Sequence, residues 1–106
     1  MRAYVYLAEA GKTILTTSSA VVAQVWRGGA RQVRLARFLT SDLVTELPLG
    51  RETSRRIGAI AAAIGAHDVV DGHIAVIALE RDAIVITSDP DDIARWGVDE
   101  RRIVTC

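Results

Sequence analysis

The amino-acid sequence predicts an α/β fold in which a parallel sheet lies between helices. Two observations favour it. Segments with helical spacing of apolar residues alternate along the chain with short apolar runs that are typical of strands. One such run, at residues 83–88, opens as AIVI, which is typical of a strand buried on both faces of a parallel sheet. The length of 106 residues, half of them hydrophobic, predicts a single domain over residues 1–106 with a packed core.

Start and stop signals give the bounds of the expected elements. Glycines end the predicted helices, and Ser, Asp and Pro begin them. In chain order we expect helix 2–10, strand 12–17, a helix from a cap at Ser18 or Ser19 to Gly28, helix 31–39, strand 43–47, helix 50–65, helix 68–82, strand 83–88, helix 90–96 and strand 102–105. Residues 4–6 would also suit a strand, because they combine two tyrosines with a valine.

Several large side chains in these helices have two interpretations. Helix 31–39 carries a basic face, for which a solvated surface is favoured over an RNA groove. That face consists of Arg31, Arg34 and Arg37. The inner face of the preceding helix is expected to be Val21, Val22, Val25 and Trp26. Trp26 and Trp96 are each predicted to be packing anchors rather than platforms on which bases stack.

The overall composition restricts the function classes. The formal net charge is zero, which argues against a broadly cationic nucleic-acid coat but leaves room for a local basic patch. The one cysteine, Cys106, allows no disulfide within the chain, which suits a reducing cytoplasm. The first residues resemble neither a signal peptide nor a membrane span, so we expect a cytoplasmic protein without membrane contact.

Carboxylates gather around one predicted helix–strand unit. Asp68 and Asp71 stand at the start of helix 68–82, and Asp89 follows the apolar strand. Ligands of open parallel sheets bind outside the carboxyl ends of the strands, which is where Asp89 is expected. Asp92 follows closely in the chain. Converging carboxylates favour a hard divalent cation, because the cation relieves their mutual repulsion.

Three stretches together resemble the PIN-domain family, and within it the VapC-like toxin ribonucleases of bacteria. They are SSAVVAQVWRGG at 18–29, DVVDGHIAVIAL at 68–79 and AIVITSDPDDI at 83–93. They are similar to the family's helix with a metal-binding Glu, its Asp-x-x-Ile-Ala helix, and its strand ending in Thr-x-Asp. They follow the family's order over most of the chain.

This resemblance implies a PIN-like three-layer domain and a metal-dependent endoribonuclease. Asp71 and Asp89 would match two of the family's catalytic and metal-binding acids, with Asp68 and Asp92 as further acids. Gln24 and Arg27 would line the site. The expected cofactor is Mg²⁺ or Mn²⁺ and the expected substrate is RNA. The family also implies a small antitoxin protein as partner and frequent dimerisation.

Two departures from the family pattern weaken the activity implied. Gln24 stands where the family has its helix Glu, and the opening strand with its Asp has no counterpart. We therefore expect weak or absent RNA cleavage. A degenerate, non-catalytic module that binds a protein or RNA is the competing class. Whether Met1 is the native start is left open. Because strand 83–88 should have neighbours on both sides, either residues 2–7 or a second copy would fill the missing position, and we expect a homo-oligomer.

Local chemistry offers less specific alternatives for the same residues. Asp89 before Pro90 is a good helix start, and Asp68 is as good a cap as a ligand. Asp91 is interpreted as a solvated charge at a helix start. His67 and Asp68 form the dipeptide of HD-type metal phosphohydrolases, a third and weaker class, because that chemistry needs more histidines than the two in this chain. A surface or hydrogen-bonded histidine is the favoured interpretation of His67 and His73.

Overall fold

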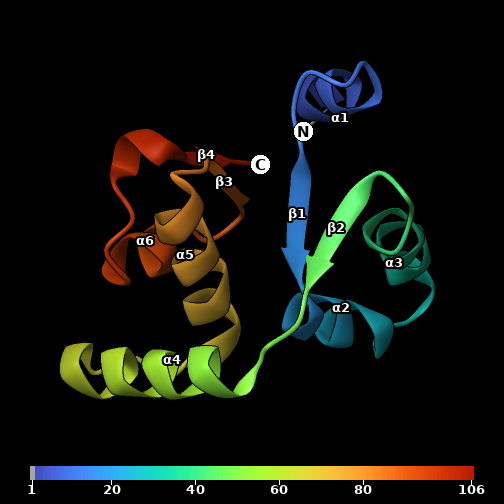
Figure 1. Cartoon of the computed structure of the whole chain (residues 1–106). Coiled ribbons are helices and arrows are strands. Elements are labelled where there is room, and N and C mark those ends of the chain that lie inside the picture. Colours follow the sequence, from blue (N-terminus) through green and yellow to red (C-terminus); the bar gives the residue numbers. More distant parts are fainter. Residues whose placement is uncertain (1) are drawn as a thin grey trace. The chain divides into compact units, whose positions relative to one another are not determined.

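The structure, a computed structural model, describes residues 2–106, without the side chain of Arg31. Within these residues helices alternate with short parallel strands (Figure 1). The elements are α1 (Arg2–Glu9), β1 (Leu15–Ser18), α2 (Ser19–Trp26), a 3-10 helix η1 (Ala30–Gln32), α3 (Val33–Leu39), β2 (Val44–Leu47), α4 (Arg51–Ile64), α5 (Val69–Arg81), β3 (Val85–Thr87), α6 (Pro90–Arg95), a 3-10 helix η2 (Glu100–Arg102) and β4 (Ile103–Thr105). The predicted α/β class is confirmed.

The chain divides into two compact units, residues 1–48 and 49–106. Each unit contains one pair of parallel strands. In the first unit β1 pairs with β2, from Leu15 opposite Val44 to Ser18 opposite Leu47. In the second, β3 pairs with β4, from Val85 opposite Ile103 to Thr87 opposite Thr105. The strands are parallel as predicted, but the described residues form two separate two-stranded sheets and not one continuous sheet.

The hydrophobic core lies in the second unit. Its buried members come from α4, the connection between α4 and α5, α5, β3, α6 and the segment that follows α6. They are Ile57, Ala66, Ala75, Val76, Ala78, Val85, Ile93, Trp96 and Val98. Trp96 is therefore a packing anchor, as predicted. Gly72 makes this packing possible, because a Cβ at that position would come within 2.6 Å of the Trp96 ring.

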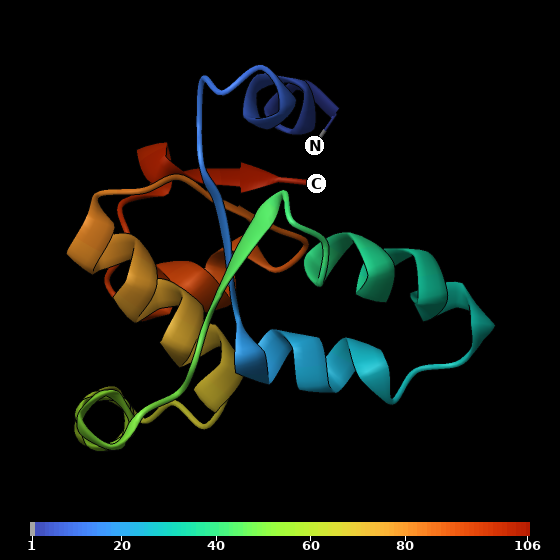
Figure 2. The same cartoon turned by 45° about the vertical axis from the view of Figure 1, so that its right-hand side comes forward.

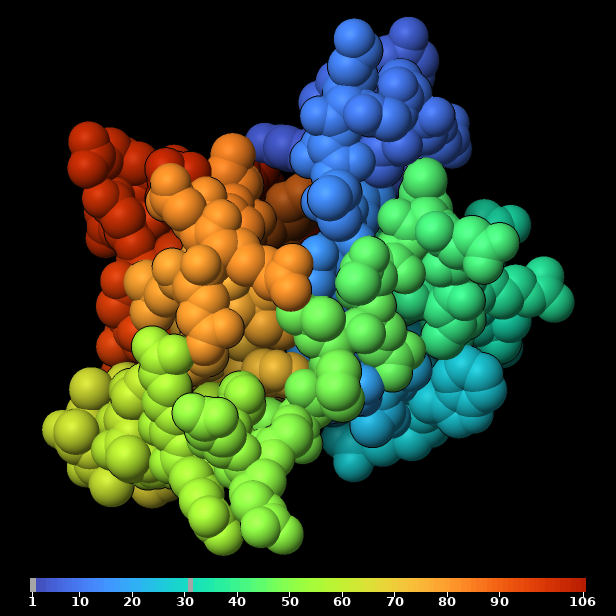
Figure 3. Space-filling view, in the orientation of Figure 1, coloured from blue at the N-terminus to red at the C-terminus, as the bar shows by residue number. Residues whose placement is uncertain are grey.

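Helix α5 is the central element of the second unit. Asp68 caps its start, and Asp82 ends it in a left-handed conformation. Helix α4 ends at Gly65, which also adopts the left-handed conformation that glycine tolerates best. The two helices are bent by 107° relative to each other, and Arg56 of α4 forms an ion pair of 2.6 Å with Glu80 of α5. Much of α4 lies on the surface, as its yellow-green atoms in Figure 3 show.

The first unit is organised differently. Among residues 2–48, with the side chain of Arg31 left aside, no helical residue is buried, and the buried residues are the polar Thr17 and Ser18 of β1. Ser18 is the N-cap of α2, as predicted, and accepts a hydrogen bond of 2.9 Å from the Ala20 N–H. Trp26 is 67% exposed, so its prediction as a packing anchor is wrong. The side chain of Arg31, a member of the predicted basic face, lies outside the description.

Two expectations about the sheet also need correction. Residues 2–7 are part of α1, which confirms the predicted N-terminal helix and excludes these residues as a strand that fills the sheet. Within residues 2–106, β3 pairs with β4 alone, and Ile84 before it is 47% exposed. Strand β3 is thus shorter than residues 83–88 and is not interior to a sheet. The apolar run therefore overestimated both the burial of this segment and the number of strands that pair with it.

No single helix among residues 2–106 is long and apolar enough to cross a membrane. The pair α4 and α5 passes such a test together, by length and composition only.

Candidate functional site: a cluster of aspartates

Four aspartates gather in the second unit, where α5 and α6 begin. Asp71 lies in the first turn of α5 and Asp92 in the first turn of α6. Asp89 follows β3 by two residues, at the carboxyl end of that strand, where ligands of parallel sheets bind. Asp68 is the N-cap residue of α5. These four residues, named here the aspartate cluster, are the acids predicted from the sequence.

Asp71 carries the electrostatic signature of the cluster. Burial raises the pKa of its carboxyl to about 6, and repulsion from Asp68, Asp92 and Asp89 contributes, as does a side-chain hydrogen bond with Asp68. Burial removes water and the neighbouring acids add like charge, so both disfavour the charged form, and the hydrogen bond with Asp68 favours the protonated form. The three neighbours are thus near enough to act on Asp71. Perturbed carboxyl groups of this kind are found preferentially at functional sites.

Asp68 has a structural role in the cluster. Its Oδ1 accepts hydrogen bonds from the backbone N–H groups of Val70, at 3.0 Å, and Asp71, at 3.1 Å. The capping interpretation of Asp68 is therefore confirmed. These bonds satisfy two of the free N–H groups at the start of α5, and they fix the first turn from which Asp71 projects.

Asp89 differs from Asp68 in this respect. It occupies the N-cap position of α6, but its side chain makes no capping hydrogen bond. Its backbone N–H donates to Thr87 Oγ1 at 3.0 Å, which holds the turn between β3 and α6. Pro90 begins the helix, where its missing N–H costs nothing. Because the exposed Asp89 carboxylate makes no hydrogen bond to the start of α6, helix capping does not explain it.

The donor chemistry of the cluster suits a hard cation, but the side chains do not form a coordination cage. Carboxylate oxygens are the ligands that Mg²⁺ and Mn²⁺ prefer. Among the described residues, however, no group of three or more His, Cys, Asp or Glu side chains is arranged to hold an ion. The fit is therefore to a site with one or two carboxylates, in which water and substrate phosphate complete the coordination, as is usual for Mg²⁺.

The other residues considered from the sequence belong to both units. Gln24 and Arg27 are exposed residues of the first unit, on α2 and at its C-cap. Asp91 is exposed in the first turn of α6, where an acid complements the helix dipole. His67 is exposed, whereas His73 is buried on α5 and its pKa is lowered by that burial. Because one histidine is exposed and the other is buried, the two do not support a histidine–aspartate phosphohydrolase site.

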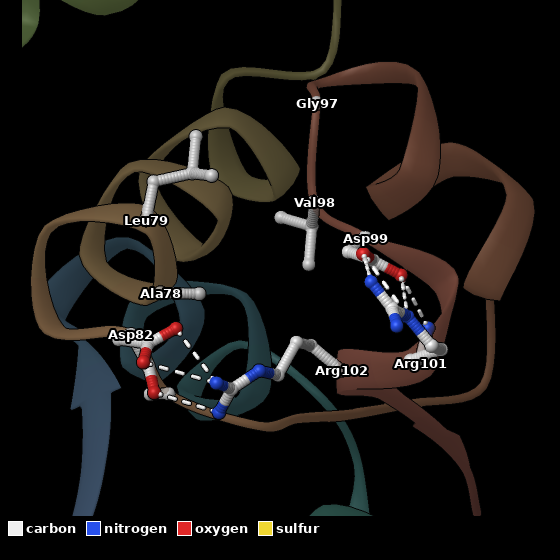
Figure 4. Close-up of a pocket in the computed structure, with 9 residues that line it drawn as sticks. Ala78, Leu79, Asp82, Gly97, Val98, Asp99, Arg101 and Arg102 are labelled. Atoms are coloured by element: carbon white, nitrogen blue, oxygen red, sulfur yellow. Dashed lines mark hydrogen bonds and ion pairs between the residues drawn. The ribbon is translucent and has the colours of Figure 1, made fainter.

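A second feature was not predicted from the sequence. A cavity of about 290 Å³ lies at the C-terminal end of α5, where Asp82 is about 17 Å along the helix axis from Asp71 (Figure 4). Its charged groups are already paired. Arg102 reaches the Asp82 carboxylate at 2.9 Å and Arg101 reaches Asp99 at 2.8 Å. Hydrogen bonds from Arg101 lower the pKa of Asp99 to about 2. Because each guanidinium has its own carboxylate, this cavity presents no net charge to a ligand.

Comparison with known proteins adds no relative: no family model matches the sequence, and no curated protein and no solved structure matches the chain.

Proposed function

We propose that this chain is a metal-dependent endoribonuclease of the PIN type, similar to VapC-like toxins and weak in activity. The observation that carries the proposal is the aspartate cluster, with Asp71 at its centre and the pKa of that carboxyl raised to about 6. A group of like charges held together at a strand end costs stability, and a cation is the ligand that relieves this repulsion.

The residues would divide the work as follows. Asp71 and Asp89 would bind Mg²⁺ or Mn²⁺ through their carboxylates, and Asp92 would add negative potential. Asp68 holds the first turn of α5 and so positions Asp71. A divalent cation bound there would make a coordinated water more acidic and neutralise charge on an RNA phosphate under attack. In such a protein the expected compartment is the cytoplasm, and a small antitoxin is the expected protein partner.

A second candidate is a non-catalytic module of the same origin. It is favoured by the neutral Gln24 at the position of the family's glutamate and by the absence, among the described residues, of a ready group of three ligands. An amide can offer its oxygen to a metal but provides no charge. In this alternative the domain would bind RNA or a protein partner without cleaving a phosphodiester bond.

The test is cleavage of a labelled mixed-sequence RNA with Mn²⁺ or Mg²⁺ and with a chelator. We expect slow cleavage that requires the metal and is abolished by Asp89→Asn. Asp91→Asn is the matched control, because Asp91 follows the same strand but does not act on the pKa of Asp71. Cleavage that survives Asp89→Asn, or that proceeds in the chelator, would refute the nuclease. Metal or RNA binding without any cleavage would favour the non-catalytic module.

A further inference from the structure

The most exposed aromatic side chain outside α1 is at an unexpected place. Trp26 is the last residue of α2 and is 67% exposed. Removing a tryptophan side chain from water contributes several kcal/mol of favourable free energy, so an exposed tryptophan can contribute to the binding of a ligand that covers it. Val33 at the start of α3 is 48% exposed as well. Trp26 precedes the short connection between α2 and α3, and Val33 follows it.

This connection is the tip of a helical hairpin. Helices α2 and α3 pack against each other, and the chain reverses between them at one end (Figure 2). The turn is held by a hydrogen bond of 3.1 Å from the Gly28 N–H to the Val25 carbonyl and one of 2.9 Å from the Gln32 N–H to the Gly29 carbonyl. The end of α2 and the start of α3 therefore lie together, which brings Trp26 and Arg27 to the same end of the hairpin as Arg34.

The hairpin is also positively charged without compensation. Between Glu9 and Asp42 the sequence contains five basic residues and no acid, although the whole chain has a net charge of zero. Arg27, Arg34 and Arg37 are exposed, and no ion pair of the described residues includes any of them. Arg34 and Arg37, three positions apart on α3, share a helix face. The arginines that do form ion pairs, Arg56, Arg101 and Arg102, lie in the second unit.

We propose that the α2–α3 hairpin binds single-stranded RNA, with Trp26 stacking on a base at its tip, Arg27 and Arg34 contacting the phosphates there, and Arg37, one turn further along α3, contacting the next phosphate. Aromatic rings next to unpaired cations are the elements with which proteins hold single strands irrespective of sequence. Guanidinium groups pair with phosphate in a bidentate way and also stack on bases. The inference deepens the proposed function, on which it rests for the choice of RNA as ligand.

Charge favours RNA over a protein partner at this surface. An exposed tryptophan and arginines are also common at protein interfaces, but there each buried cation needs a counter-charge from the partner. The phosphates of a single strand supply such charges at regular spacing, and the surface itself offers no acid. The expected number of phosphate contacts is about one for each arginine, which sets the salt dependence of binding.

The test is fluorescence anisotropy of a labelled oligouridylate of about 12 nucleotides, titrated with the whole chain in a chelator over a series of salt concentrations. We expect Trp26→Ala to weaken binding about tenfold and Trp26→Phe to retain most of the affinity. The Arg34→Gln/Arg37→Gln variant should reduce the slope of log K against log salt by about 1.4, that is, about 0.7 for each contact.

The matched control is Arg51→Gln/Arg55→Gln, which removes two exposed arginines from α4. It should leave the slope unchanged. Equal losses in the two double variants would mean that net charge alone attracts the RNA, and an unchanged affinity of Trp26→Ala would show that no base stacks there. Either result overturns the proposal, as does equally tight binding of heparin, a polyanion without bases. The proposal is also overturned if RNA does not bind and light scattering finds a homodimer that Trp26→Ala dissociates, because Trp26 would then be a dimer contact.

The design separates this surface from the proposed nuclease. Binding is measured in a chelator, so it does not depend on the metal that the aspartate cluster would hold. RNA binding that depends on Trp26, without any cleavage, supports the surface and refutes the nuclease. Metal-dependent cleavage that is unaffected by Trp26→Ala supports the nuclease and refutes the surface.

Discussion

Replacing Asp71 with Asn should stabilise the protein at neutral pH. Asp71 is half-buried among Asp68, Asp89 and Asp92, and burial and repulsion together raise the pKa of its carboxyl from 3.8 to about 6. The folded state therefore disfavours the charge that Asp71 carries at neutral pH. An asparagine has the same shape, carries no charge and can donate an N–H to Asp68 in place of the carboxyl proton.

The pH dependence of this gain follows from the two pKa values. Below 3.8 the carboxyl is neutral in both the folded and the unfolded chain, so Asn and Asp are equivalent. Between 3.8 and about 6 the unfolded chain loses its proton first, and the folded state is progressively disfavoured. Above about 6 the cost is complete. At about 1.4 kcal/mol for each pKa unit, and reduced for solvent screening of a half-exposed group, it amounts to about 1–2 kcal/mol.

Urea unfolding at a series of pH values measures this directly. We expect Asp71→Asn to raise the free energy of unfolding by about 1–2 kcal/mol at pH values above 6 and to lose that advantage near pH 4. Asp91→Asn, which removes an exposed charge from the start of α6, should stay within about 0.5 kcal/mol of the unmodified chain. A gain that is absent at neutral pH, or equal at all pH values, would refute the electrostatic account of the cluster.

Three further outcomes are expected. Asp68→Ala should cost about 1 kcal/mol of stability in urea unfolding and Asp89→Ala much less, because only Asp68 makes capping hydrogen bonds; equal losses would contradict this difference. Gly72→Ala should cost about 1–3 kcal/mol, since the added methyl group meets the Trp96 ring, and an unchanged unfolding midpoint would show that the ring moves aside freely. Light scattering at micromolar concentration should find a homo-oligomer, because β3 has one open edge within residues 2–106, whereas a monomer would contradict a second copy at that edge.

Much of the local structure could be predicted from the sequence. The signals that worked are chemical and short in range. Ser18 begins α2 with its hydroxyl, Gly65 ends α4 because it adopts a left-handed conformation, and Pro90 begins α6. Each depends on backbone geometry that neighbouring residues dictate, so no knowledge of the rest of the chain was needed.

Properties that depend on distant residues were harder to predict. Trp26 follows the apolar spacing of α2, but its position next to the hairpin turn leaves it exposed. The continuous apolar run before Thr87 indicates burial, yet hydrogen bonding on both edges requires a second strand whose presence the run does not encode. The cavity near Arg102 could not be predicted from a local sequence pattern, because its walls come from α5 and from the segment after α6, which are apart in the chain.

The aspartate cluster shows both sides of this limit. The sequence predicted that a helix start and a strand end meet, which would place Asp68, Asp71, Asp89 and Asp92 close together. The raised pKa of Asp71, to which the other three acids contribute, agrees with this prediction. Spacing did not distinguish Asp68, which caps, from Asp89, which does not. That difference depends on whether a carboxylate reaches backbone N–H groups, and it appears only in three dimensions.

The central claim is that the aspartate cluster binds a divalent cation. Calorimetric titration of the whole chain with Mn²⁺ at pH 7.5, where the Asp71 carboxyl is ionised, tests it most directly. We predict one binding event that is lost in Asp71→Asn, kept in Asp91→Asn and weakened at pH 5, where Asp71 is largely protonated. The absence of binding by the unmodified chain, or binding that Asp71→Asn leaves unchanged, would contradict the account.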